Sequence, residues 1–372
     1  MKVVIAPDKF KGCLSAAEVA ASIAAGVRTF NPNIHIDLCP MADGGEGTVA
    51  AMVAAAGGRI ITNRVTGPLP EMKVDASWGM LPDATAVIEM SAASGLALLK
   101  PADRNPLNTT TFGTGELIAA AIRNGAKKII LGIGGSATID AGIGCAQACG
   151  FTVLLRDGVP TSMTEPLCGR DIENVLSVKH GRGEITAGIE IVVACDVTNP
   201  LHGPSGAAHI FGPQKGATAE IVTRLDDDLR ALAQRCGKKR EALMDGAGAA
   251  GGLGFGLLAF FGAFLQSGVK LIADAVRLRD RLHNADLCFT GEGQIDGQSA
   301  AGKTVGGVAR ICREMNIPCI ALAGTIGEGA EKVLEQGLSR YFAIADRPTI
   351  ASEVRRGLAD AAAEQLRRFQ TR

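Results

Sequence analysis

The chain has few aromatic residues and no surplus of either charge. Aromatic side chains make up 4% of its 372 residues, and 38 Lys and Arg balance 38 Asp and Glu. The charge balance therefore gives no argument for a nucleic-acid partner, and the absence of like-charge blocks gives none for an anionic membrane surface. Glycine is abundant instead, at 48 residues, or about 13% against a usual share of about 7%. This composition is typical of an α/β enzyme with close helix–sheet contacts and phosphate-binding loops.

Motifs for several other chemistries are missing. None of the ten cysteines forms a CxxC pair, and several stand inside predicted strands, so we interpret them as small buried residues of a reducing, cytoplasmic compartment. The five His show no zinc-binding spacing, and Ser136 lacks the GxSxG context of a hydrolase. The start, MKVVIAPDKF, predicts a strand and not a signal peptide. Residues 246–269 are uncharged, but only 253–265 are strongly apolar, which is short of the ~20 residues of a membrane span.

Alternating strands and helices at the two chain ends predict the architecture. Strands are expected at 2–6 and 34–39, with a helix between them that starts at a capping box of Ser15 and Glu18. From Asp286 onward, three further strand–helix units follow. Five parallel strands match a flavodoxin-like doubly wound sheet. We therefore expect one discontinuous domain of residues 1–66 and 284–372, with a second α/β domain, residues 67–283, inserted in it.

The inserted segment has a different pattern. Two short strands, 73–78 and 86–89, are expected to pair antiparallel. Further strands are predicted at 128–131, 151–155 and 189–195, and helices at 114–124, 219–236, 253–266 and 268–282. No internal repeat or low-complexity linker is visible.

The predicted strand order brings two polar segments together. In a 2-1-3-4-5 sheet, a crevice opens between the carboxyl ends of strands 1 and 3. Asp8, Lys9 and Lys11 follow the first strand, and the strand 286–290 leads into a Gly-rich loop and a helix at Lys303. That loop carries Glu292 and Asp296, and carboxylates beside a lysine suit a metal–phosphate complex. We expect the inserted domain to form the opposite wall of a cleft.

Three Gly-rich stretches resemble nucleotide-binding motifs. GQSAAGKT, residues 297–304, matches GxxxxGK[ST], but six residues separate it from the preceding strand, which disfavours a P-loop. GIGGSA, residues 132–137, with Asp157 further on, resembles a dinucleotide fingerprint and keeps an NAD-dependent oxidoreductase open as the alternative. GAGAAG, residues 246–251, lacks a clear preceding strand. These glycines either present N–H donors to a phosphate or allow tight packing.

Other charged residues are candidates by position. Asp43 and Glu46 lie in MADGGEGT, where Glu46 is equally explained as a first-turn acid of the next helix. Asp196 follows a strand, a usual place for a functional carboxylate, although a loop turn also explains it. Lys215 precedes a helix and is otherwise a surface charge. A metabolite-binding protein without catalysis also remains open.

Taken together, the motifs resemble the bacterial glycerate kinase family, of the glycerate 2-kinase type. They follow in order along nearly the whole chain: APDKFKG (6–12), MADGGEGT (41–48), GTGE (113–116), GIGGSAT (132–138), CDVTNPL (195–201), FGPQKGA (211–217), GAGAAGGLG (246–254) and TGEGQID (290–296). The chain departs from the family's pattern at Ile139, Ala141 and Val305. The resemblance implies a flavodoxin-like domain with an inserted α/β domain, and Mg²⁺- and ATP-dependent phosphorylation of D-glycerate, at the 2-hydroxyl by family preference.

Candidate roles follow from this chemistry. Phosphoryl transfer requires positioning and charge neutralisation more than covalent catalysis. We expect the Gly-rich loops and Lys303 to hold ATP, through Gly134, Gly135, Ser136, Gly291 and Gly293. Glu292 and Asp296 are candidates for the Mg²⁺ ligands. Asp8, Asp43 and Asp196 are candidate bases, and Lys9, Lys11 and Lys215 are candidates to hold the carboxylate or the transferred group. We expect the partners to be the small molecules D-glycerate and ATP, and neither nucleic acid nor a membrane. A homodimer is a possible assembly, but the residues do not indicate the oligomeric state.

Overall fold

The chain folds into two compact units in a computed structural model that describes residues 1–161, 165–181, 184–300, 303–344 and 350–370. The first unit comprises Met1–Asp43, Ala50–Gly57 and Ser267–Arg372. The second comprises Gly44–Val49 and Gly58–Gln266. Each is described by itself below.

A five-stranded parallel sheet forms the centre of the first unit, in the order β13-β12-β11-β1-β2. Counted within this unit, the order is 2-1-3-4-5, which confirms the flavodoxin-like prediction. Its strands are β1 (Lys2–Ile5), β2 (His35–Leu38), β11 (Leu287–Ile295), β12 (Cys319–Ile326) and β13 (Arg340–Ala343). Its helices are α1 (Ala16–Phe30), α2 (Thr48–Ala56), α10 (Gly268–Ala275), α11 (Leu278–Leu282), α12 (Gly297–Ala300), α13 (Thr304–Glu314), α14 (Lys332–Glu335) and α15 (Ala351–Gln370), of which α2 starts in the second unit.

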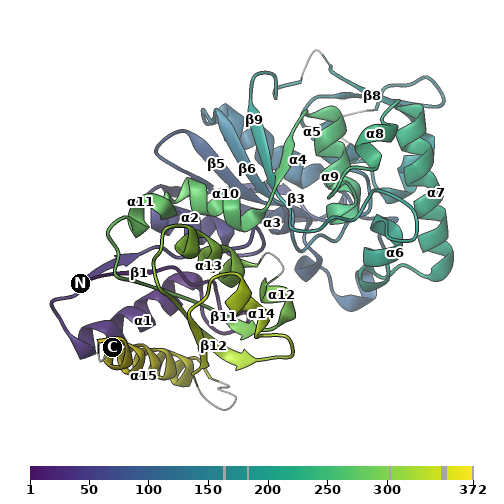
Figure 1. The fold of residues 1–372 in the computed structure, drawn as a ribbon. Coiled ribbons are helices and arrows are strands. Elements are labelled where there is room, and N and C mark those ends of the chain that lie inside the picture. Colours follow the sequence, from purple (N-terminus) through teal and green to yellow (C-terminus); the bar gives the residue numbers. More distant parts are fainter. Residues whose placement is uncertain (162–164, 182–183, 301–302, 345–349, 371–372) are drawn as a thin grey trace. The chain divides into compact units, whose positions relative to one another are not determined.

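Helices cover both faces of this sheet, as a doubly wound fold requires. Alternate strand residues such as Val3, Ile5 and Phe289 are fully buried in one core with α1 and α15, which lie side by side (Figure 1). The two helices approach closely at Gly26, where an added Cβ would stand 2.0 Å from the Ala359 carbonyl oxygen. The opposite face packs against α13.

The second unit has a mixed six-stranded sheet, in the order β10-β9-β6-β5-β4-β3. Strands β5, β6, β9 and β10 are parallel, and β3 and β4 are antiparallel, as is the predicted pairing of β4 with β5. The strands are β3 (Arg59–Thr66), β4 (Lys73–Met80), β5 (Thr85–Glu89), β6 (Lys128–Gly132), β9 (Glu190–Ala194) and β10 (Phe264–Gln266), with β7 (Thr152–Leu155) and β8 (Val175–Lys179) forming a separate antiparallel pair. The helices are α3 (Ser91–Ser94), α4 (Phe112–Arg123), α5 (Ile143–Ala148), α6 (Ala207–Phe211), α7 (Ala219–Arg235), α8 (Lys239–Ala242) and α9 (Ala249–Phe260), with 3-10 turns η1 (Leu96–Leu98), η2 (Pro101–Asp103), η3 (Gly169–Asn174) and η4 (Pro213–Lys215).

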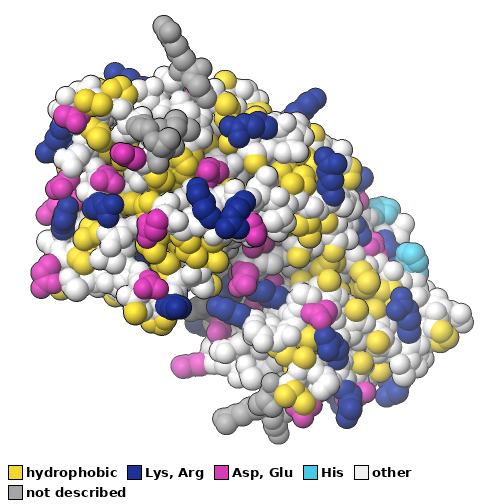
Figure 2. All heavy atoms as spheres, turned by 180° about the vertical axis from the view of Figure 1, so that it is seen from behind, with side chains coloured by type: hydrophobic (Ala, Val, Ile, Leu, Met, Phe, Trp, Pro, Cys, Tyr) yellow, Lys and Arg dark blue, Asp and Glu magenta, His cyan; other side chains and the backbone are white. Residues whose placement is uncertain are grey.

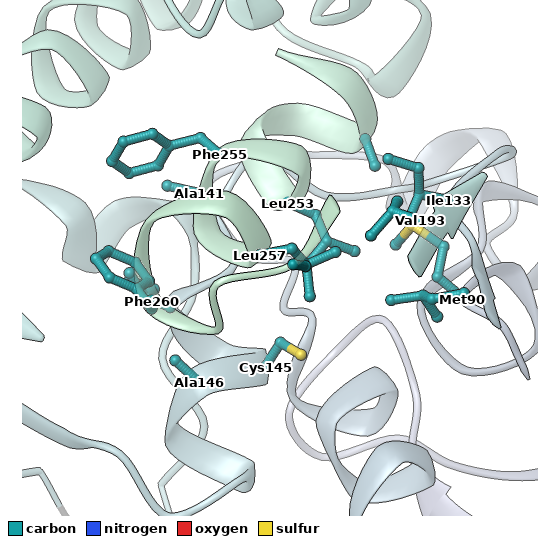
Figure 3. Close-up of a cluster of buried hydrophobic side chains, with 14 of the residues drawn as sticks. Met90, Ile133, Ala141, Cys145, Ala146, Val193, Leu253, Phe255, Leu257 and Phe260 are labelled. Carbon is teal, nitrogen blue, oxygen red and sulfur yellow. The ribbon is translucent and has the colours of Figure 1, made fainter. Parts of the chain in front are cut away.

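The apolar stretch that raised the question of a membrane span is part of the core of this unit. Leu253 and Leu257 of α9 are fully buried against residues of the sheet, including Val193 (Figure 3). Within the described part of the chain, no helix is long and apolar enough to cross a membrane. On the face drawn in Figure 2, basic and acidic side chains are interspersed, in keeping with the zero formal net charge.

The predicted domain boundaries are wrong at both junctions. Residues 59–66 were expected in the first domain, but they form β3, which pairs along its whole length with β4 of the second unit. Residues 267–283 were expected in the inserted domain, but α10 and α11 belong to the first unit. There Arg281 forms an ion pair with Asp37 of β2 and donates to the backbone carbonyl of Ala55. Long-range hydrogen bonds decide to which unit residues 59–66 and 267–283 belong, and the pattern of residue types does not reveal these bonds.

Two secondary-structure predictions also need correction. The helix expected over 253–266 ends at Phe260, because Gly262 takes a left-handed φ of +64° and the chain then pairs with β9 as β10. The strand expected to stop at Thr290 continues to Ile295, because it pairs with β12 as far as Ile326. Glu292 therefore projects from a strand and not from a loop.

Candidate active site

The first group of candidate residues gathers at the carboxyl ends of β1 and β11. Backbone pairing continues past β1, since the Ala6 N–H donates to the Phe289 carbonyl at 2.7 Å and the Asp8 N–H to the Gly291 carbonyl at 2.8 Å. An added Cβ on Gly293 would stand 3.5 Å from the Lys11 backbone nitrogen. The prediction that the segment of Asp8 to Lys11 lies beside β11 is thus confirmed within this unit.

Asp8 is a buried carboxylate held in place by its neighbours. It is 7% exposed, and its carboxylate accepts hydrogen bonds from the Lys9 N–H at 2.7 Å and from the Thr304 hydroxyl. Burial, followed by the charge of Asp43, raises the pKa of Asp8 to about 6. Asp8 and Asp43 are therefore close enough to interact electrostatically, and Asp8 titrates near neutral pH.

Glu292 is a second buried carboxylate in the same group. It is 8% exposed, and burial raises its pKa to about 7, against the opposing effects of a Ser299 hydrogen bond and the charge of Lys303. The charges of Asp8 and Asp296 raise it further. Its Oε1 atom is buried with no hydrogen-bond partner among the described residues. A buried unpaired carboxylate oxygen is unfavourable unless a cation or donor binds to it.

Thr304 and Ser299 contact these carboxylates, and sequence reasoning did not select either. Both lie in GQSAAGKT, whose glycines and lysine are the residues that the phosphate-loop pattern indicates. Thr304 is the first residue of α13, and Ser299 lies in α12. The Ser/Thr that ends the GK[ST] pattern is the signal by which Thr304 could have been found.

The phosphate-loop resemblance of this stretch is not supported as a fold. Its described first half, Gly297–Ala300, is the short helix α12, which starts directly after Asp296, and residues 301–302 lie outside the described residues. Lys303 does stand at the N-cap position of α13, where unpaired N–H groups and the helix dipole favour an anion. At Gly291, an added Cβ would be 2.2 Å from the Leu322 carbonyl oxygen, so strand packing alone requires glycine there.

The second group of candidates lies in the second unit, after β6. Gly134, Gly135 and Ser136 follow this strand, and Lys215 reaches their loop from η4. Lys215 is 2% exposed, and its Nζ donates to the Ser136 hydroxyl at 2.7 Å and the Thr138 carbonyl at 2.8 Å. Burial lowers the pKa of Lys215 to about 7, and the charge of Asp140 opposes this shift. The alternative interpretation of Lys215 as a surface charge is therefore wrong.

The dinucleotide interpretation loses its structural basis. No helix starts directly after GIGGSA, because α5 begins only at Ile143. Asp157 lies beyond β7, which pairs with β8 outside the six-stranded sheet. The glycines of GAGAAG serve packing, since an added Cβ on Gly251 would stand 1.8 Å from the Thr138 carbonyl oxygen.

Asp196 is exposed two residues after β9, at the carboxyl edge of the second sheet. The MADGGEGT loop reaches the same edge, because an added Cβ on Gly44 would be 2.5 Å from the Cβ of Ala194. Lys9 is half-buried and Lys11 exposed in the first unit. The candidates therefore form two groups, one around Asp8 and Glu292 and one around Ser136 and Lys215.

Two sets of side chains have the chemistry of metal ligands. The carboxylates of the first group suit Mg²⁺, which prefers oxygen. Separately, the sulfur atoms of Cys288, Cys312 and Cys319 lie within 4.8 Å of one another in the interior of the first unit. Sulfur suits soft metals and not Mg²⁺. All ten cysteines are free thiols, most of them buried, as the sequence predicts.

Fold and site together define an α/β protein with a doubly wound sheet and buried carboxylates at the point where its strand order reverses, a usual position for ligand sites. Comparison with known proteins gives a narrower identity. The model of the glycerate kinase family matches residues 3–371. Glycerate kinase of Bacillus subtilis is 45% identical over 349 residues, covering 92% of this chain and 90% of its own. Glycerate 2-kinase of Escherichia coli is 43% identical over 365 residues, covering 97% and 94%.

A solved structure agrees with this result. A crystal structure assigned to glycerate kinase 2 of Salmonella typhimurium LT2 superposes with a TM-score of 0.88 at 42% identity, covering 100% of this chain and 98% of that one. The chain belongs to the glycerate kinase family.

Proposed function

We propose that the protein transfers the terminal phosphoryl group of ATP to the 2-hydroxyl of D-glycerate, giving 2-phosphoglycerate and ADP. Family membership supports the reaction class, and the relative named glycerate 2-kinase supports the position of transfer. The observation that carries the proposal is the pair of buried carboxylates, Asp8 and Glu292, beside the start of α13. Phosphoryl transfer needs a proton acceptor, a metal site and cations for phosphate in one place.

Asp8 is the residue that we propose as the base. A general base works best when its pKa is near the working pH, and burial raises the pKa of Asp8 to about 6. The Thr304 hydroxyl and the Lys9 N–H fix its two oxygens. Asp43, whose charge acts on Asp8, and Asp196 remain the other candidates.

Glu292 is the residue that we propose as the main Mg²⁺ ligand, with Asp296 as a second. The fit rests on the buried, unpartnered Oε1 of Glu292 and on the all-oxygen donor set. A bound Mg²⁺ ion would neutralise charge on the transferred group. We further propose that Lys303 attracts phosphate oxygens, which its N-cap position on α13 supports, and that Lys215 of the second unit holds a substrate anion.

The proposal is tested by measuring ADP release from ATP and Mg²⁺ with D-glycerate, compared with L-glycerate and with no acceptor. We expect D-glycerate-dependent ADP release, lost in Asp8→Asn and Glu292→Gln. Absence of ADP release from the wild-type protein would contradict the proposal, and a change in nicotinamide absorbance on adding NAD and D-glycerate would favour the oxidoreductase instead.

Localisation and assembly belong to the same proposal. Ten free thiols support a reducing compartment, and we propose the cytoplasm. A homodimer stays a prediction, which light scattering on the purified protein tests directly.

A further inference from the structure

Lys215 is a buried cation without a matching buried anion at hydrogen-bond distance. An ammonium group has three N–H donors. Two of them are used, on the Ser136 hydroxyl and the Thr138 carbonyl, and both acceptors are neutral. No ion pair involving Lys215 occurs among the residues that the structure describes. Burying a charge is costly unless it is paired, so this environment favours an incoming anionic oxygen.

A second polar group in the same loop also lacks a partner. The hydroxyl of Thr138 is fully buried and makes no hydrogen bond within the described part of the chain. Buried hydroxyls are nearly always paired in native proteins. Thr138 already binds Lys215 through its carbonyl, so one residue connects the unpaired hydroxyl with the incompletely paired ammonium.

Asp140 organises the loop that carries both groups. It is fully buried, and one oxygen accepts from the N–H and the hydroxyl of Thr111, each at 2.7 Å. The other oxygen accepts from the Gly142 N–H at 3.1 Å. These bonds tie the loop after β6 to the start of α4. Because they occupy the carboxylate, Asp140 acts on Lys215 through its charge and not through a direct bond.

We propose that Lys215 and the Thr138 hydroxyl form the subsite for the carboxylate of the substrate, and that Asp140 is a positioning residue that fixes this loop and supports the charge of Lys215. This inference rests on the proposed function. One remaining ammonium donor and one hydroxyl match the two oxygens of a carboxylate, whereas a transferred phosphoryl group has three oxygens and more charge. The subsite therefore predicts selectivity for a hydroxy acid over a neutral polyol.

The subsite predicts uptake of a proton on binding. Burial lowers the pKa of free Lys215 to about 7, and Asp140 opposes that shift. Among the described residues, Asp140 is the charged side chain that affects the pKa of Lys215. Arg104 is also nearby, and its backbone carbonyl packs against Gly216, the residue after Lys215. An anion beside Lys215 favours its charged form. At pH 8, binding of glycerate should therefore take up about 0.9 proton per site, since a lysine of pKa about 7 is mostly neutral there.

Calorimetry of D-glycerate binding, in Tris and in HEPES buffers of different ionisation enthalpy, measures that uptake. The wild-type protein should take up a proton at pH 8. Lys215→Met should bind about 10- to 100-fold more weakly, the loss typical of a charged hydrogen bond, and take up none. Thr138→Val should weaken binding without changing the uptake. Glycerol, which has a neutral hydroxymethyl group in place of the carboxylate, should show no Lys215-dependent uptake.

The variant Asp140→Asn tests whether Asp140 acts on Lys215 through its negative charge or only holds the loop in place. Removing the negative charge should lower the pKa of Lys215, so the alkaline limb of kcat/KM should move to lower pH and proton uptake at pH 7 should increase. Circular dichroism checks that the variant is folded; if it is not, Lys215→Met and Thr138→Val still decide the subsite.

Several results would overturn the inference. They are the absence of uptake in the wild-type protein, equal uptake in Lys215→Met, or uptake that follows a non-hydrolysable ATP analogue and not glycerate. An unchanged pH profile in folded Asp140→Asn would remove its positioning role. If ADP release with glycerate persists in any of the three uptake cases, the subsite is wrong and the proposed function stands.

Discussion

Replacing Asp8 by Asn should stabilise the protein while abolishing catalysis. Asp8 is 7% exposed, and burial raises its pKa from an ordinary 3.8 to about 6. For an acid with a raised pKa, the folded state binds the proton more tightly, so stability falls as the pH rises through this range. The full effect, at about 1.36 kcal/mol per unit, is about 3 kcal/mol above pH 7. Asparagine has no charge to bury at any pH.

Asparagine also fits the hydrogen bonds at this position. Its side-chain oxygen can accept from the Lys9 N–H, and its amide can donate to the Thr304 hydroxyl, which accepts as well as donates. The stability difference between variant and wild type should therefore grow with pH, from about 1 kcal/mol at pH 4.5 to about 3 kcal/mol at pH 8.

Urea unfolding in EDTA, followed by far-ultraviolet circular dichroism at several pH values, measures this difference. Trp78 of β4 is the only tryptophan and lies in the second unit, so its fluorescence reports on the unfolding of that unit. Asp360→Asn, an exposed carboxylate on α15, is the matched control and should show no such pH dependence. A destabilised Asp8→Asn, or a difference independent of pH, would refute the reasoning.

Three further changes probe the site and its support. Asp196→Asn should lower kcat by about 10²- to 10⁴-fold if this residue is the base, with unchanged urea unfolding because the side chain is exposed; near-normal turnover would eliminate it. Thr304→Val removes a hydrogen bond that lowers the pKa of Asp8, so the acidic limb of kcat/KM should move to higher pH, whereas Thr304→Ser should leave it in place. Gly291→Ala should destabilise by about 1–3 kcal/mol, since its Cβ would stand 2.2 Å from the Leu322 carbonyl oxygen; unchanged urea unfolding would disprove that contact.

The parallel sheet of the first unit was accessible from sequence because its strands are short apolar runs between clear helices. Once the order 2-1-3-4-5 is accepted, the encounter of Asp8 with Glu292 follows, because parallel strands in one sheet end at the same edge. The place of Glu292 on a strand did not follow. Glycines around it indicated a loop, whereas Gly291 is required by its close pairing with β12.

The partners of the buried polar groups were not accessible from sequence. Asp140 lies in a stretch that attracted notice only for departing from the family's pattern, and its role depends on Thr111, 29 positions earlier. The environment of Lys215 likewise depends on a loop 77 and 79 positions away. Such contacts are set by tertiary packing, and the local periodicity of the sequence does not predict them. The short strand β10 was missed for the same reason, since only its pairing with β9 distinguishes it from the end of an apolar helix.

The most direct measurement is the identity of the product formed from D-glycerate and ATP with Mg²⁺. Phosphorus NMR of the reaction mixture should show ADP and one phosphate monoester in equal amounts, with the ester phosphorus coupled to the single proton of C2, as in 2-phosphoglycerate. Coupling to the two methylene protons of C3 would contradict the proposed position of transfer. Failure to form any ester would contradict the proposed kinase activity itself.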